Sequence, residues 1–143
     1  MTERGSDHKL PVIRGTDDEP HRKAPPEQFI GEARIHSVSE LLGTEQTRIR
    51  YVVFEPGART RPHRHSKDQV LCFHGGPGVV AVDGGEDQII REGEFVLLPG
   101  GVVHMHGATA DAPTTHISMM LSIDSDFETD IPAGWARFRA PRR

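Results

Sequence analysis

The sequence predicts an all-β domain, a β-sandwich or barrel with one short helical turn near its N-terminus. Seven short segments rich in β-branched and aromatic residues follow one another through the middle of the chain, and glycine or proline closes most of them. Fifteen glycines and eleven prolines favour many short elements joined by turns over a few long helices. A chain of 143 residues is the size of one ordinary domain and can bury a core.

The predicted elements begin with the helix and continue as strands. The helix lies in "SVSELLG", where Ser37 or Ser39 is a candidate N-cap and Gly43 a candidate end. The first strand, "TRIRYVVFE", stops at a proline-glycine pair, and "VVAVDGG" contains an Asp-Gly dipeptide, which is a strong hairpin signal. The other predicted strands are "DQVLCFH", "DQIIREGE", "FVLLPGG", "VVHMHG" and "THISMMLSI".

We expect the barrel to span residues 28–125. Residues 1–27 are polar, charged and interrupted by prolines, which predicts a flexible N-terminal arm that could cross to a partner subunit. Residues 126–143 form a predicted C-terminal tail with four arginines, and a basic end this short is more typical of a solvated terminus than of a binding patch.

Composition narrows the function classes. A net charge of -4 and the absence of a broad basic region argue against a nucleic-acid partner. No apolar run is long enough for a membrane span, and the N-terminus lacks the apolar stretch of a secretory signal. The single cysteine, Cys72, has no partner for an intrachain disulfide, so the expected location is the cytoplasm.

Two His-x-His pairs are the strongest chemical signal in the chain. His63 and His65 are two residues apart on a predicted strand, so both side chains lie on one face, and Gln69 shares that face if the strand has no bulge. His104 and His106 form a second pair of the same kind. Imidazoles that meet in a barrel interior need a partner, and a divalent zinc, manganese, iron, copper or nickel ion supplies one. Two pairs therefore favour a metal site over scattered surface histidines.

The same residues resemble a known family. The stretch from Gly57 reads G-x5-H-x-H-x3-Q-x6-G, and the stretch from Gly93 reads G-x5-P-x-G-x2-H. These resemble the two signature motifs of the cupin superfamily, over about residues 45–122. The usual first motif has glutamate where this chain has Gln69, and the usual second motif ends with asparagine where this chain has Ala108.

The resemblance implies a double-stranded β-helix, the jelly-roll barrel of cupins. It also implies a divalent metal held by His63, His65, Gln69 and His104, and usually a homodimer.

A narrower resemblance exists. "FEPGART", "HRHSKDQ", "PGGVVHMHGA" and "TH" look like the small bacterial manganese cupins that include hydroxynitrile lyases and relatives of carboxymuconolactone decarboxylases. Those proteins also carry glutamine at the third ligand position. The resemblance implies that His106 and His116 face the cavity near the metal without ligating it, and it favours manganese or iron over zinc or nickel.

Gln69 changes the charge at such a metal. Three histidines and a carboxylate leave a divalent cation with a net charge of +1, whereas three histidines and an amide leave it at +2. The higher charge polarises a bound oxygen more strongly and disfavours the ferric state. This favours Lewis-acid chemistry, with His106 and His116 as candidate catalytic acids or bases, over oxygen activation. For His106, a hydrogen bond that orients a ligand is the alternative role.

Strand alternation predicts which side chains line a substrate pocket. Arg50 alternates with Val52; if it faces inwards it would attract a carboxylate or an enolate, and if outwards it is a surface or interface residue. Ser118 shares the face of His116 on the last strand. The rest of the expected pocket is mostly apolar: Val52, Leu71, Phe73 and Met120.

The leading hypothesis is a metal-dependent cupin enzyme that acts on a small oxygenated organic substrate as a lyase, cyclase or isomerase. One alternative is a non-haem iron dioxygenase. The other is a non-catalytic barrel that binds a small ligand or a metal.

Overall fold

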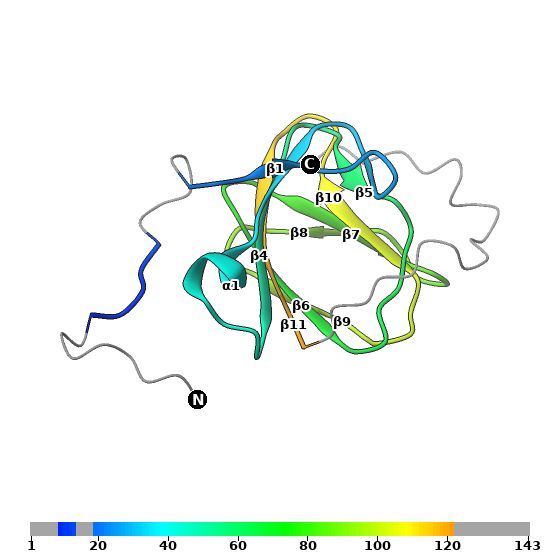
Figure 1. Cartoon of the computed structure of the whole chain (residues 1–143). Helices are drawn as coiled ribbons and strands as arrows, with labels where there is room; N and C mark the ends of the chain where they lie inside the picture. Colours follow the sequence, from blue (N-terminus) through cyan, green and yellow to red (C-terminus); the bar gives the residue numbers. More distant parts are fainter. Residues whose placement is uncertain (1–8, 14–18, 122–143) are drawn as a thin grey trace.

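The computed structural model describes residues 9–13 and 19–121 (Figure 1). The predicted C-terminal tail, 126–143, and parts of the predicted N-terminal arm lie outside the described residues. Within the described part, no helix is long and apolar enough to cross a membrane.

Two antiparallel sheets face each other around the core, which confirms the predicted all-β fold (Figure 1). The first sheet has the order β1-β3-β4-β11-β6-β9 and the second the order β2-β5-β10-β7-β8. Strands of the first sheet are β1 (Arg22–Lys23), β3 (Ala33–His36), β4 (Arg48–Phe54), β6 (Gln69–His74), β9 (Phe95–Leu98) and β11 (Thr114–Met120). Strands of the second are β2 (Phe29–Ile30), β5 (Arg59–Thr60), β7 (Gly78–Val82), β8 (Gln88–Ile90) and β10 (His104–Ala108).

The predicted helix is present as α1 (Val38–Leu42). Ser37 occupies the N-cap position, and Gly43 ends the helix in the left-handed conformation at φ 80°, which glycine adopts without strain. The Ser39 hydroxyl accepts a hydrogen bond from the backbone N–H of Ile49 at 3.1 Å. This bond ties the helix to the start of β4.

The strand predicted around His63 and His65 is absent, and the observed strand β1 lies outside the range predicted for the barrel. His63 and His65 fall in the irregular connection between β5 and β6, where His63 forms only an isolated bridge with His104. Pro62 precedes this bridge and has no backbone N–H to continue a ladder, so the strand is interrupted there. Strand β1 pairs with β3, so the sheet begins before residue 28.

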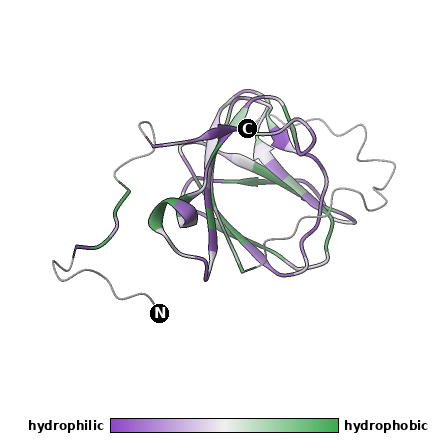
Figure 2. Cartoon of the chain, viewed as in Figure 1, coloured by the Kyte–Doolittle hydropathy of each residue, from purple (hydrophilic) through white to green (hydrophobic). Residues whose placement is uncertain are grey.

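The core consists of two apolar clusters inside the barrel. One contains Ile35, Val52, Phe54, Ala58 and Ala108, and the other Leu71, Phe73, Val80, Ile90 and Leu98. Hydrophobic residues accordingly appear in both sheets in Figure 2, whereas β1 is hydrophilic. His116 contacts one phenylalanine from each cluster, with ring centroids 5.0 Å from Phe54 and 5.4 Å from Phe73. His116 therefore lies in the barrel interior, between the two clusters.

Candidate metal centre

Three of the histidines converge in the interior from two separate segments of the chain. The ring centroid of His63 lies 4.8 Å from that of His65 and 4.5 Å from that of His104. The rings of His65 and His104 are 5.2 Å apart. All three side chains are buried. The isolated bridge aligns the two segments, because the backbones of His63 and His104 exchange hydrogen bonds of 3.0 and 2.8 Å.

Backbone carbonyls fix the tautomer of two of these rings. The Nδ1–H of His63 donates to the carbonyl of Arg61 at 2.7 Å, and that of His104 donates to the carbonyl of Val102 at 3.0 Å. A carbonyl can only accept, so each Nδ1 carries the proton and each Nε2 presents a lone pair. This is the arrangement in which a second hydrogen bond orients a metal-ligating histidine.

Gln69, the first residue of β6, presents its amide oxygen in the same way. Its Nε2 donates to the hydroxyl of Ser118 at 2.7 Å, which leaves Oε1 as the free end of the amide. Oε1 and the Nε2 of His104 are both buried and have no hydrogen-bond partner among the described residues. Leaving buried acceptors unsatisfied is costly, about 1–3 kcal/mol each. The donor set therefore fits a divalent cation, which accepts lone pairs from both.

His106 also lies close to this group. One potential ligand atom from each of His63, His104 and His106 falls within 4.8 Å of the others. The ring of His106 is stacked on that of His104 at a centroid distance of 5.6 Å, and its Nε2 is buried without a hydrogen-bond partner among the described residues. By geometry His106 thus adjoins the predicted ligands, and the resemblance implied this position near the metal but outside the ligand set.

His106 is paired with His116, its neighbour on the facing sheet. Nδ1 of His106 lies 3.0 Å from Nε2 of His116, so one ring donates to the other. Both side chains are buried. A second bond, from the backbone N–H of His106 to the hydroxyl of Thr60 at 3.1 Å, holds β10 against β5 at this point.

Burial keeps the interior histidines neutral. Desolvation lowers the pKa of His104 to about 4 and that of His116 to about 3. Desolvation also lowers the pKa of His63, where His104 adds to the effect, and that of His106, where His116 adds to it; both fall well below 6.5. Neutral imidazole is the form that ligates a metal and the form that accepts a proton.

A small cavity of about 50 Å³ opens onto the histidines. Four of the six predicted pocket residues line it: Arg50, Val52, Ser118 and Met120. His63, His65, Gln69, His106 and His116 contribute to the same wall. Two larger hollows, of about 300 and 470 Å³, contain none of these residues.

Two predicted pocket residues do not line the cavity. Leu71 and Phe73 face the interior, as alternation predicts, but both are fully buried and pack against Val80, Ile90 and Leu98. Alternation determines on which face of a strand a side chain lies, but it does not determine how far along the barrel axis that side chain is. Conversely, Arg48 lines the cavity and was not predicted. The sequence did contain evidence for this position, because Arg48 and Arg50 are two residues apart on β4 and therefore lie on the same face.

Comparison with known proteins identifies the family. A family model described as "Cupin domain" matches residues 50–120. The chain is 32% identical over 102 residues to an (R)-mandelonitrile lyase from Granulicella tundricola, covering 71% of this chain and 78% of that protein. A crystal structure of a cupin-like protein from Thermotoga maritima has a TM-score of 0.72 at 29% identity, covering 86% of this chain and 96% of that chain.

A further solved structure has the same fold. It is a predicted oxalate decarboxylase from Thermotoga maritima with a TM-score of 0.65, 15% identical, covering 78% of this chain and all of that chain. In this fold the cluster of His63, His104 and His106 points to a divalent metal centre. The matched domain, the mandelonitrile lyase relative and the jelly-roll architecture together place the chain in the cupin superfamily.

Proposed function

We propose that the protein is a metal-dependent enzyme that acts on a small oxygenated organic molecule by Lewis-acid and general acid–base chemistry, as a lyase, cyclase or isomerase. One observation carries this proposal: unprotonated ligand atoms and a hydrogen-bonded pair of histidines face the same small cavity. The likeness to a mandelonitrile lyase supports lyase-type chemistry in particular.

The ligand set we propose is His63, His65, Gln69 and His104, with manganese or ferrous iron as the metal. A bound divalent cation would supply Lewis-acid polarisation of a substrate oxygen. The chain's own contribution is to aim the ligand atoms. Arg61 and Val102 orient two rings through their carbonyls, and Ser118 turns the amide oxygen of Gln69 away from itself.

His106 and His116 are proposed to move a proton. When the Nδ1–H of His106 donates to Nε2 of His116, the Nε2 of His106 presents a lone pair to the cavity side. A proton taken up at this Nε2 allows the Nδ1 proton to pass to His116, so that the positive charge moves one ring away from the substrate. The reverse transfer returns a proton to the product.

The low pKa values set the strength of this base. Burial makes both rings weak bases, since the pKa of His116 falls to about 3 and that of His106 well below 6.5. Such a weak base can remove a proton only from a group that has been made more acidic, such as a C–H group beside a polarised oxygen of the substrate. Its conjugate acid gives the proton back readily, which suits an acid–base cycle.

Hydrogen exchange tests the proposed function directly. We expect the manganese-loaded protein to catalyse deuterium uptake into pyruvate or hydroxyacetone in heavy water under anaerobic conditions, followed by mass spectrometry. His116→Ala should lower the rate by about 100-fold or more while the metal content is kept. His74→Ala is the matched control, because His74 pairs in register with Thr115, next to His116, and lies on the opposite face of the sheet.

The alternatives predict different results. Exchange or turnover that requires dioxygen would point to a dioxygenase. Exchange that is unaffected by His116→Ala would overturn the proton-transfer role.

A second variant tests Gln69. In Gln69→Glu, a carboxylate replaces the amide oxygen and can accept a hydrogen bond from the Ser118 hydroxyl, so the geometry is kept. We expect manganese to bind at least about 10-fold more tightly, since a carboxylate is the better ligand for a hard divalent cation. Chelator competition measures the affinity. Gln88→Glu, on the exposed start of β8, adds the same charge elsewhere. Equal affinity in Gln69→Glu and the wild type would contradict ligation by Gln69.

We also propose that the chain forms a homodimer through the outer face of the six-stranded sheet. Alternation places Val70, Cys72, Phe95, Leu97, Ile117 and Met119 on this face. Phe95 is 68% exposed and Leu97 56% exposed, and single subunits rarely leave so apolar a face in water. A second copy is the occupant we favour because the N-terminal segment around Pro11–Ile13 extends along an open groove beside Ile117, which suits an arm that crosses between subunits.

Light scattering after size exclusion tests the dimer. The wild type is expected to have twice the 15.8 kDa mass of one chain, and Leu97→Glu should shift the mass towards one chain, because a buried unpaired carboxylate opposes association. Ile89→Glu, on the other sheet, is the control: Ile89 is 38% exposed. A wild type with the mass of a single chain would overturn this interface.

A further inference from the structure

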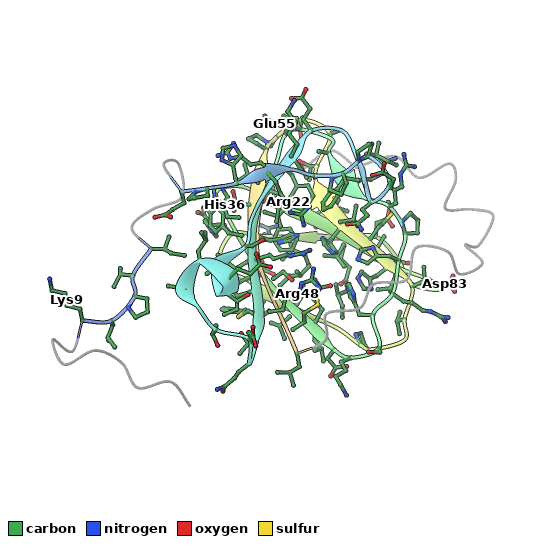
Figure 3. The ribbon with its side chains drawn as sticks, viewed as in Figure 1. Lys9, Arg22, His36, Arg48, Glu55 and Asp83 are labelled. Atoms are coloured by element: carbon green, nitrogen blue, oxygen red, sulfur yellow. The ribbon has the colours of Figure 1, made fainter. Side chains whose placement is uncertain are left out.

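The cavity has positive charge at its wall and no acidic side chain among the residues that line it. Arg48 and Arg50 both line the cavity, together with the histidines and Gln69. Arg22 is a third arginine nearby. Its register partner is Ile35, whose own partner on β4 is Val52, so Arg22 belongs to the same inner face (Figure 3). Arg48 and Arg50 therefore give positive charge to the wall of a cavity whose other lining residues are neutral, and the exposed Arg22 lies near enough to Arg50 to repel it.

Strand register places Arg50 beside the proposed metal ligands. Arg50 pairs with Ser118 across β4 and β11, at the usual strand spacing of about 4.8 Å. Ser118 in turn accepts the hydrogen bond from the amide of Gln69. Arg50 is therefore on the strand next to Ser118, the residue that orients Gln69. A short molecule is long enough to touch both Arg50 and the ligand cluster in a cavity of about 50 Å³.

Arg50 forms no direct ion pair within the described residues. It is half-buried, and no hydrogen bond or ion pair joins it to any described side chain. Burial, followed by repulsion from Arg48 and Arg22, lowers the pKa of Arg50 to about 10, and Glu40 offsets this only in part. A half-buried cation among like charges is costly unless an anion joins it.

We propose that Arg50 binds a carboxylate of the substrate, which makes the substrate class small carboxylic acids with a second oxygen, such as 2-hydroxy or 2-oxo acids. This inference rests on the proposed function, because the second oxygen is directed to the metal-ligand cluster. The planar fork of a guanidinium matches the two oxygens of a carboxylate, and the small cavity suits a molecule of few atoms. The carboxylate would fix one end of the substrate in the cavity that His106 also lines.

A pair of nearly isosteric ligands tests this assignment. Lactate carries the carboxylate and lactamide replaces it with a neutral amide, while both keep the 2-hydroxyl. Each is titrated into cobalt-loaded protein, and the visible cobalt bands report both metal occupancy and ligand binding. We expect lactate to bind at least about 10-fold more tightly than lactamide to the wild type, as charge-assisted hydrogen bonds are stronger than neutral ones.

Variants identify the residue responsible. Arg50→Gln should bring the lactate-to-lactamide ratio close to one, and Arg50→Lys should keep part of the preference because the charge remains and the fork is lost. Arg91→Gln removes the same charge from an exposed turn outside the cavity and should behave as the wild type. Unchanged cobalt bands show that each variant has kept its fold.

The outcomes separate the two proposals. A wild type that binds cobalt but takes lactate and lactamide equally, or an Arg50→Gln variant that keeps the full preference, would overturn the carboxylate assignment and leave the metal enzyme standing. A wild type that binds no cobalt would overturn the proposed function and this inference with it.

Discussion

Replacing His104 by alanine is expected to remove bound metal from the protein. The Nε2 of His104 is a buried lone pair held in place by the bond from Nδ1 to the carbonyl of Val102, so its loss removes a ligand atom that is already oriented. Loss of a hydrogen bond that only orients a ligand already costs about 10–100-fold in metal affinity, and loss of the ligand itself should exceed about 100-fold. Metal analysis after equilibration with equal manganese measures the difference.

Thermal unfolding gives a second measurement of the same effect. Manganese that binds only the folded protein stabilises it, by about 2.7 kcal/mol at a free concentration 100 times the dissociation constant. We expect this stabilisation in the wild type and not in His104→Ala. His21→Ala is the control, because His21 is exposed and lies outside the cavity. A His104→Ala protein that still gains stability from manganese would show that His104 is not a ligand.

The order of the strands could not be predicted from the sequence, although most of the strands could. Period-two patterns and turn dipeptides predicted β4, and they predicted the hairpin from β7 to β8, where Gly84 adopts φ 78°. The position of β11 between β4 and β6 is a pairing of segments far apart in the chain. Local residue patterns carry no signal for such a pairing, so only the resemblance implied the jelly-roll.

The candidate site shows the same division between local pattern and three-dimensional context. Alternation grouped Ser118 with His116 on one face of the last strand but left the face of Arg50 open, and both Arg50 and Ser118 line the cavity. It could not separate Met120, which lines the cavity, from Leu71 and Phe73, which are sealed in the core. Whether an inward side chain borders the cavity or is sealed in the core depends on which side chains of the opposite sheet face it. The sequence of a single strand does not contain this information.

The backbone carbonyls that accept hydrogen bonds from His63 and His104 could not be predicted from the sequence. Each ring bonds to the carbonyl two residues before it, a contact that depends on the local backbone path of an irregular segment. In a regular strand, which we expected around His63, the carbonyl of Arg61 would instead accept a hydrogen bond from a neighbouring strand. The interruption after Pro62 is therefore what frees a backbone acceptor to orient the ring.

Acid is expected to destabilise the metal-free protein steeply. The folded-state pKa is about 4 for His104 and about 3 for His116, below the value of about 6.5 in an unfolded chain. Between these limits the unfolded chain binds more protons than the folded protein, so the free energy of unfolding decreases as the pH falls from 6.5 towards 4. Each histidine contributes up to about 1.4 kcal/mol per pH unit, which amounts to about 3 kcal/mol for His104 over the whole window.

Urea unfolding of chelator-treated protein at pH 7, 6, 5 and 4.5 measures this dependence. His116→Phe should give a shallower slope, by up to about 1.4 kcal/mol per pH unit, because one buried titrating group is removed. Phenylalanine suits the site, since His116 already contacts the rings of Phe54 and Phe73. His21→Phe, the same substitution at an exposed position, is the control. Stability that stays constant from pH 7 to pH 5 would mean that the interior histidines accept protons while folded, and the neutral pair that we assign to proton transfer would then lose its physical basis.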